Sequence, residues 1–257
     1  MSKLQSSVQH GGILRPFRKI ALLVAERWPL PVRCRLRSGR LMYVDLRSAI
    51  GRGIFMQGEF DPAVFQPFAM GLKPGDTFVD LGANVGYYSL LALDVVNKTG
   101  SIYAFEIDDR PLRCLRKTII TQQISNIHLI EKAVGDSIGT SCAVKMGECG
   151  NTHLTDHSAN GTPVATITLD HWYLNCGKPR VHAIKMDIEG SELRALQGAK
   201  LLISEQRPLI VCEAWDNAAD PLQGQVARLL RELNYKVTAL EGAHSPAIMA
   251  SQEGDTG

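Results

Sequence analysis

The segment Asp80-Leu-Gly-Ala-Asn-Val-Gly86 constrains the fold more than any other part of this 257-residue chain. It follows a short β-prone run at 77–81 and leads into a run with helical spacing at 86–97. Its two glycines allow a tight turn and a close backbone approach to a ligand, because they lack a Cβ atom. Asn84 is one of the few residue types that tolerate a left-handed conformation. A glycine turn between a strand and a helix is typical of ligand-binding α/β domains.

Strand-like and helix-like runs alternate from residue 77 onward. Buried strands separated by helices predict an α/β fold with a mainly parallel sheet covered by helices on both faces. Ligands of such sheets bind beyond the carboxyl ends of the strands. The expected strands are 77–81, 101–106, 127–134, 182–186, 208–212 and 236–240, and the expected helices are 86–97, 111–124, 191–203 and 222–233.

Three segments lie outside this alternation. Residues 1–72 form an N-terminal extension, with an expected helix at 14–28 and short strands around 34–37 and 41–45, which we expect to pack on or cap the site. Residues 73–241 form the main domain, whose polar insertion at 137–168 is long enough to indicate either a functional or a disordered segment. Residues 242–257 are weakly patterned and are expected to be a C-terminal tail.

Composition narrows the functional classes. The chain is 45% apolar and 21% charged, which is ordinary for a soluble globular protein, and its formal net charge of +2 gives no argument for nucleic acid binding. We expect a cytoplasmic protein, because we find no signal peptide and no membrane span and the six cysteines are scattered. Basic residues cluster at 15–40, as a solvated face or as a contact for an acidic or lipid-linked acceptor. The oligomeric state stays open.

Glu106 lies twenty residues after Gly86, at the end of the second expected strand. An acid there is placed to accept hydrogen bonds from ribose hydroxyls. A dinucleotide would bring its pyrophosphate to the helix start, where Asp80 adds a negative charge. S-adenosylmethionine instead carries a sulfonium and an ammonium group, which an acid favours. The G-x-x-x-G spacing also departs from G-x-G-x-x-G. We therefore expect S-adenosylmethionine, with an NAD(P)-dependent oxidoreductase as the alternative.

Further motifs extend this interpretation across residues 54–215. They are Gly58-Glu-Phe-Asp61, Lys73-Pro-Gly-Asp76, Phe105-Glu106, Ala133-Val-Gly-Asp136, Thr168-Leu-Asp170, Lys185-Met-Asp-Ile-Glu-Gly190, Gly198-Ala199 and Pro208-Leu-Ile-Val-Cys-Glu213. In this order they resemble the FkbM-type methyltransferases. The resemblance implies a class I, Rossmann-like methyltransferase fold, S-adenosylmethionine as methyl donor, and a hydroxyl acceptor on a sugar, polyketide or other metabolite. The family usually has proline after the ribose acid, where this chain has Ile107, and that difference affects loop shape more than chemistry.

The expected cofactor-binding residues come from the glycine loop and the following strand ends. They are Asp80, Gly82, Ala83, Asn84, Gly86, Tyr87, Glu106, Ala133, Val134 and Glu59. By analogy with class I enzymes, Ala133 and Val134 would lie near the adenine, although the acid common there is absent. Glu59 and Tyr87 are candidates for the methionine part, and Tyr87 is equally compatible with a place in the core.

Methyl transfer to an alcohol requires a positioned acceptor and a group that removes its proton. Strand alternation puts Lys185, Asp187 and Glu189 on one side of an extended segment, and these are the expected catalytic residues. We expect Asp187 to be the base or to orient the acceptor, with Lys185 fixing its charge. Glu189 and Glu192 can instead be acids that favour a helix N-terminus.

The acceptor side is less defined. Glu213, His153 and His157 are candidate acceptor contacts, or else a strand-end carboxylate and two loop residues. No metal is expected, although Mg²⁺ in an acidic cleft and zinc at Cys142, Cys149, His153 and His157 stay open. A degenerate binding module without turnover is the non-enzyme alternative, and the intact Lys185-to-Gly190 motif argues against it. The expected partner is a small-molecule or glycan-type hydroxylated acceptor.

Overall fold

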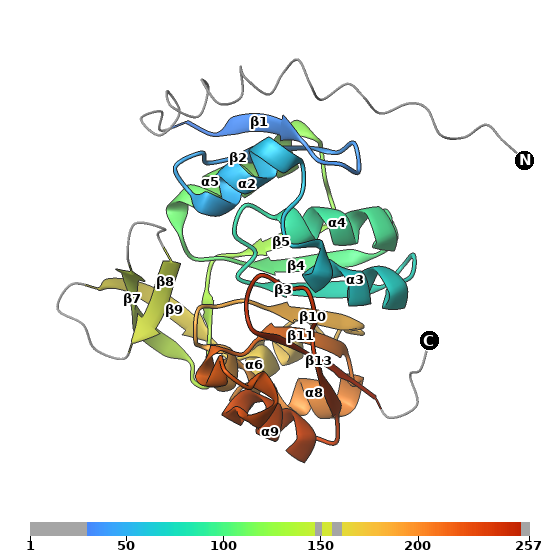
Figure 1. Ribbon diagram of the computed structural model, residues 1–257, viewed down its shortest axis with the longest axis vertical. Coiled ribbons are helices and arrows are strands. Elements are labelled where there is room, and N and C mark those ends of the chain that lie inside the picture. Colours follow the sequence, from blue (N-terminus) through green and yellow to red (C-terminus); the bar gives the residue numbers. More distant parts are fainter. Residues whose placement is uncertain (1–29, 147–150, 156–160, 253–257) are drawn as a thin grey trace, which may run out of the picture.

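A seven-stranded sheet forms the centre of the protein, whose computed structural model describes residues 30–146, 151–155 and 161–252 (Figure 1). Its first five strands in chain order are parallel, as predicted, and β13 runs antiparallel to both of its neighbours. In spatial order the strands are β12 (Lys236–Ala239), β13 (Ala247–Ser251), β11 (Leu209–Glu213), β10 (Ala183–Met186), β3 (Thr77–Leu81), β4 (Ser101–Phe105) and β5 (Ile127–Ile130).

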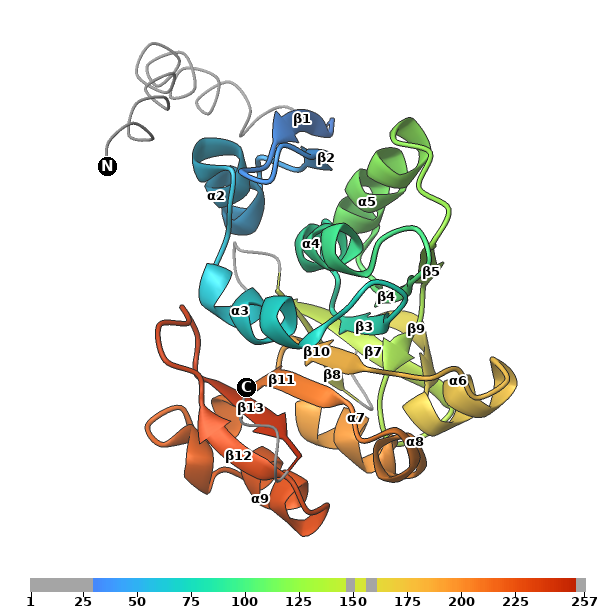
Figure 2. The same ribbon diagram turned by 90° about the vertical axis from the view of Figure 1, so that its right-hand side faces the viewer.

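Helices cover both faces of the sheet (Figure 2). One face carries α3 (Pro62–Gly71), α4 (Tyr87–Val96) and α5 (Asp109–Thr121) over a core that contains Phe68 and Phe78. The other face carries α6 (Leu169–Asn175), α7 (Glu192–Gln197), α8 (Lys200–Gln206) and α9 (Gln225–Glu232), over a core that contains Trp172. Two 3₁₀ turns, η1 (Trp215–Asn217) and η2 (Pro221–Gln223), connect β11 to α9. Because both faces are covered, every residue of β3 is buried, which explains why its apolar residues do not alternate with exposed polar ones.

The third expected strand, 127–134, is wrong as one element. It ends at Ile130, and the exposed residues Glu131 and Lys132 separate it from a short strand, β6 (Ala133–Val134). The two exposed charges end β5, which is the edge strand of the main sheet, before the chain turns away to β6. The β6 strand pairs instead with β9 (Thr162–Ile167) in a second sheet, built from the polar insertion with β7 (Gly139–Met146) and β8 (Asn151–Thr155) in the order β6-β9-β7-β8.

The single helix expected at 191–203 is also wrong, because it breaks between α7 and α8 at Gly198 and Ala199. A Cβ at Gly198 would lie 2.2 Å from the carbonyl oxygen of Gly135, so this glycine permits a close backbone contact with the residue after β6. The segment expected to be a tail contributes β13, between β11 and β12. Burial of its apolar residues in the second core explains why Ala247–Ser251 is ordered into the sheet.

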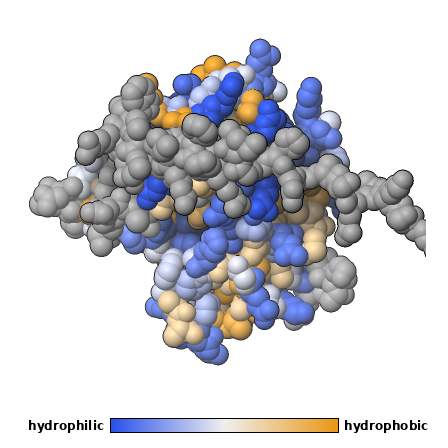
Figure 3. Space-filling view, turned by 45° about the horizontal axis from the view of Figure 1, so that its top comes forward, coloured by the Kyte–Doolittle hydropathy of each residue, from blue (hydrophilic) through white to orange (hydrophobic). Residues whose placement is uncertain are grey.

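The described part of the extension packs on the α5 side of the domain. The antiparallel pair β1 (Val32–Arg35) and β2 (Leu41–Val44) confirms the two expected strands, and the amide of Tyr43 donates to the hydroxyl of Thr118 on α5. Helix α2 (Ala49–Gln57) follows, which the sequence did not predict, and the helix expected at 14–28 lies outside the described residues. Hydrophilic and hydrophobic side chains are intermixed on the coloured upper part of the view in Figure 3.

Candidate active site

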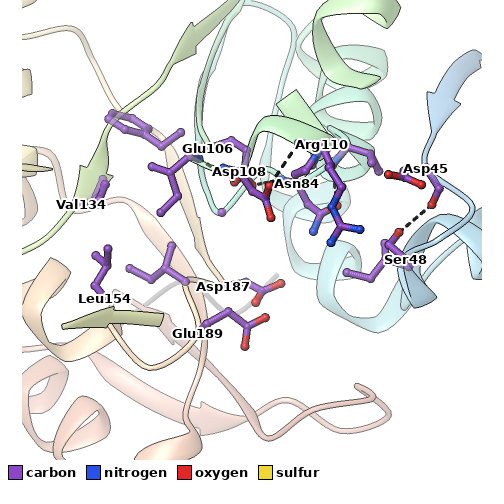
Figure 4. A pocket seen from close by; sticks show the side chains of 18 of the residues that line it. Asp45, Ser48, Asn84, Glu106, Asp108, Arg110, Val134, Leu154, Asp187 and Glu189 are labelled. Atoms are coloured by element: carbon purple, nitrogen blue, oxygen red, sulfur yellow. Dashed lines mark hydrogen bonds between the residues drawn. The ribbon is translucent and has the colours of Figure 1, made fainter. Parts of the chain in front are cut away.

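A cleft opens at the carboxyl ends of β3, β4 and β10, where the chain crosses from one half of the sheet to the other (Figure 4). This is the switch point at which α/β sheets bind ligands. The cleft contains about 1070 Å³ of empty space, part of it open solvent, which is ample for a nucleoside-sized ligand. Besides the strand-end loops, the start of α2 and Leu154 of β8 line it, so both the extension and the insertion border the site.

The glycine loop is fixed by its own backbone. Gly82 has φ +73°, and a Cβ there would lie 1.8 Å from the carbonyl oxygen of Asp187, so only glycine fits between the two loops. The amides of Gly82 and Ala83 both donate to the carbonyl of Phe105, at 3.0 and 2.9 Å. Asn84 has the left-handed conformation that was predicted, with φ +50°. The loop therefore presents a preformed backbone edge to the cleft.

Glu106 is held by three backbone amides. Its Oε2 accepts from Asn84 at 2.7 Å, and its Oε1 accepts from Ile107 at 2.7 Å and from Asp108 at 2.8 Å. Burial raises the pKa of Glu106, and these three hydrogen bonds act in the opposite direction. A carboxylate offers about four acceptor positions, so one stays open for a hydroxyl donor in the cleft.

The charge of the lining is mainly negative. Among the described residues that line the cleft, only Arg110 and Lys132 have cationic side chains. A cleft of this charge favours a cationic ligand and opposes a pyrophosphate. The carboxylates that line it are Asp45, Glu106, Asp108, Asp187 and Glu189.

One end of the cleft is apolar. Val134 and Leu154 lie together at that end, away from the carboxylates of Asp187 and Glu189 (Figure 4). Ala133 lines the cleft as well. Both Ala133 and Val134 therefore border the cleft as expected, although from β6 rather than from the end of the third strand of the main sheet.

Asp80 does not line the cleft. Its side chain is fully buried, its Oδ2 accepts from the hydroxyl of Ser89 at 2.6 Å, and its Oδ1 lies 3.5 Å from Nζ of Lys185. Lys185 is also buried, and it donates to the carbonyl of Gly82 at 2.9 Å. Its sheet partner, which the alternation argument did not include, is Asp80 of β3, so Lys185 lies opposite Asp80 inside the domain.

Lys185 nevertheless reaches Asp187, since its Nζ lies 3.3 Å from the Asp187 Oδ2. Burial alone would lower the pKa of Lys185, but the carboxylates of Asp187, Asp80 and Glu213 together raise it. The side chain of Asp187 is 29% exposed and faces the cleft. This cation can therefore hold the charge of Asp187 from inside the protein, as expected.

Glu189 also lines the cleft, and its carboxylate lies beside that of Asp187 (Figure 4). The segment is not extended there, because Glu189 and Gly190 have φ +54° and +90°. Glu192 stabilises this turn, since its Oε1 accepts from the amides of Ile188 at 2.9 Å and Gly190 at 3.3 Å. Its position at the start of α7 fits the helix-start interpretation.

Several expected site residues are not among those that line the cleft. Tyr87 is buried with its ring centroid 5.1 Å from that of Tyr88, and Glu59 forms an ion pair with Arg37 at 2.7 Å. Gly86 begins α4 and packs against Leu115.

On the acceptor side, His153 lies near the 187–190 turn, with its Nδ1 3.8 Å from the place a Cβ of Gly190 would take. His157 and Cys149 lie outside the described residues. Within the described ranges, no group of three or more His, Cys, Asp or Glu side chains could hold a metal ion. No helix in this part of the chain has the length and hydropathy needed to cross a membrane.

The sequence missed the contribution of α2. The residues Asp45, Ser48, Ala49 and Ile50 all line the cleft. Ser48 caps α2 by accepting from the amide of Gly51 at 2.9 Å, and this serine was the available signal for a helix start. The two glycines inside α2 weaken its helical pattern, so the sequence did not predict a helix there.

Comparison with known proteins connects this geometry to a family. The FkbM methyltransferase domain model matches residues 80–237, which is more than half of the chain. None of the curated proteins compared matches the chain.

A solved structure of the family shows the same fold. The FkbM methyltransferase of Methylobacillus flagellatus KT superposes with a TM-score of 0.54 and 21% identity, over 77% of this chain and 52% of that one. This chain thus spans about half the length of that relative. The precorrin-6y C5,15-methyltransferase of Geobacter metallireducens GS-15 has a TM-score of 0.48 and 14% identity, with 82% and 96% of the two chains covered. The family match confirms the resemblance found in the motifs, and the chain belongs to the FkbM methyltransferase family.

Proposed function

We propose that this protein is an S-adenosylmethionine-dependent O-methyltransferase that uses the cleft between β3, β4 and β10. The observation that carries the proposal is the placement of Glu106 and Asp187 on two loops of one cleft, on either side of the glycine loop. A ribose-type diol and an acceptor hydroxyl can therefore be bound by the same preformed edge.

The residues present fit the donor. Gly82 lets the backbone approach closely, Glu106 keeps one acceptor position open, and the apolar end at Val134 and Leu154 suits a flat base. The excess of carboxylates suits the sulfonium and ammonium groups. S-Adenosylmethionine supplies a methyl group that its sulfonium has already activated for displacement.

The protein's own task is to position the hydroxyl and take its proton. Asp187 is the proposed base: as the C–O bond forms and the C–S bond breaks, the hydroxyl proton passes to the Asp187 carboxylate. Lys185 keeps its proton and holds Asp187 in place from inside the domain, at 3.3 Å. Glu189, beside Asp187, adds negative charge near the reacting groups.

The acceptor is a small-molecule or glycan-type hydroxyl compound in this proposal, and not a nucleic acid. The extension at residues 1–72 and the insertion at 137–168 decide which acceptor enters, because α2 and β8 border the cleft. We place the donor-binding domain at 73–241, with the 242–257 segment adding β13. A cytoplasmic location is part of the same proposal.

The substitution Asp187→Asn tests the base. It keeps the size of the side chain and removes the proton acceptor, so turnover should fall by about two to four decades while S-adenosylhomocysteine still binds. The assay measures label transfer from methyl-labelled S-adenosylmethionine to a panel of monosaccharides and phenols. Asp94→Asn, at a surface ion pair of α4 with Arg40, is the matched control and should keep full activity.

Normal turnover in Asp187→Asn would remove this residue from the mechanism. Binding of S-adenosylhomocysteine without transfer to any of the compounds tested would instead support the module without turnover. Binding of NADH would support the oxidoreductase alternative.

A further inference from the structure

Glu213 has a carboxyl group that the proposed reaction does not use. It ends β11, the strand beside β10, and it does not line the cleft. Its Oε2 accepts from the indole N–H of Trp215 at 3.0 Å. Asp187 and Glu213 directly follow the paired residues Met186 and Cys212 of the parallel strands β10 and β11, so the two residues lie side by side. Glu213 is therefore a close neighbour of the proposed base, whose charge acts on it.

Two neighbouring carboxylates repel each other when both are ionised, and a proton on one of them removes the repulsion and supplies a hydrogen-bond donor. The surrounding charges lead to the same conclusion. Lys185 is the cation in contact with this cluster, and Asp80 already lies 3.5 Å from its Nζ. Ionisation of Asp80, Asp187 and Glu213 together would leave two negative charges without a partner.

The proton belongs on Glu213 rather than on Asp187. Asp187 contacts Lys185 and is partly open to the cleft, and both features favour its charged form. Glu213 is more enclosed, and burial together with the charge of Asp187 raises the pKa of Glu213 to about 8.

The other charged groups around Glu213 are already engaged. Asp216 of η1 accepts from the amides at the start of α9. His244, next to Ser245, lies 3.8 Å from the carboxylate of Asp61 and is mostly exposed. Neither side chain supplies the counter-charge that an ionised Glu213 would need.

We propose that Glu213 is a positioning residue that stays protonated at neutral pH and donates a hydrogen bond to Asp187, thereby orienting the base. Asp187 is then held by two donors, the ammonium of Lys185 and the carboxyl of Glu213, and its remaining acceptor positions serve the incoming hydroxyl. The inference rests on the proposed function for the role of Asp187, but the shared proton can be tested without donor or acceptor.

The experiment follows the indole N–H resonance of Trp215 by ¹⁵N NMR in the full chain between pH 5.5 and 9.5. Trp215→Phe identifies the resonance by its loss. In the unsubstituted protein the resonance should shift with a midpoint near pH 8, because the indole hydrogen-bonds to the titrating carboxyl. Trp172 is the internal reference, since its buried indole nitrogen has no hydrogen-bond partner among the described residues.

Two variants locate the proton. Glu213→Gln should abolish the shift, because the amide keeps the contacts but does not titrate. Asp187→Asn removes the negative neighbour and should move the midpoint well below pH 8. Glu205→Gln, at a surface carboxylate paired with Lys178, is the control and should change nothing.

Three results would each overturn the inference. They are a resonance in the unsubstituted protein that does not shift between pH 6 and 9.5, a shift that persists in Glu213→Gln, and a midpoint that stays at 8 in Asp187→Asn. Because no substrate is present, these results are independent of S-adenosylhomocysteine binding, which tests the proposed function.

Discussion

Replacement of Gly82 by alanine tests whether the cleft depends on the close contact between the glycine loop and the 187–190 turn. The residue has φ +73°, which costs an L-residue about 1–2 kcal/mol. The added Cβ would also lie 1.8 Å from the carbonyl oxygen of Asp187, and relief of such an overlap by backbone movement typically costs a further 1–3 kcal/mol. We expect Gly82→Ala to lower the free energy of unfolding by about 2–5 kcal/mol in total.

Gly177→Ala is the matched control, because Gly177 has φ +77° and nothing lies within 4 Å of its Cβ position. It should lose only the conformational part, about 1–2 kcal/mol, and keep full affinity for S-adenosylhomocysteine. Both variants are measured by urea unfolding and by calorimetric titration. In Gly82→Ala the affinity should fall at least tenfold, since the overlap displaces the glycine loop, which itself lines the cleft. Equal stability of the two variants, together with unchanged affinity in Gly82→Ala, would refute the reasoning.

Three further predictions follow from the contacts at and near the site. Glu106→Gln should weaken S-adenosylhomocysteine binding about ten- to a hundredfold in calorimetry, because the amide replaces a charged acceptor of three backbone N–H groups; unchanged affinity would contradict this role. The raised pKa of Glu213 stabilises the fold below pH 4.5, and this stability is lost as pH rises to about 8. Urea unfolding should therefore show the unsubstituted protein losing at most about 3 kcal/mol relative to Glu213→Gln between pH 5.5 and 8, and parallel curves would argue against it. Arg194→Ala, which breaks an exposed ion pair with Asp136, should change stability by less than about 1 kcal/mol, and a larger loss would show that this pair anchors the second sheet.

The predicted order of strands and helices in the main domain agrees with the structure where the local pattern and the tertiary packing coincide. The run at 77–81 is a strand that is buried throughout, so its short, β-prone and mainly apolar pattern was sufficient to predict it. The pattern at 127–134 did not reveal where the strand ends, because the break depends on two exposed charges and on pairing with a strand 33 residues later in the chain.

The sequence predicted those site residues whose place in the cleft follows directly from their position at the end of a strand. Glu106, Asn84 and Asp187 sit at strand ends, and all three line the cleft. The positions of Lys185 and Asp80 were not predictable, because their burial depends on the pairing of β10 with β3.

The contribution of α2 was not predictable either, since it comes from a segment that is distant in sequence and has a weak helical pattern. Its serine cap was readable, but nothing in the sequence places this helix start against the cleft. That placement depends on the packing of β2 against α5.

The most direct test of the central claim is calorimetric titration of the full chain with S-adenosylhomocysteine, with NADH as the control ligand. The acidic cleft with its amide-held Glu106 predicts micromolar binding of S-adenosylhomocysteine at a one-to-one ratio and no binding of NADH. Binding of NADH, or of neither ligand, would contradict the assignment of this cleft to S-adenosylmethionine.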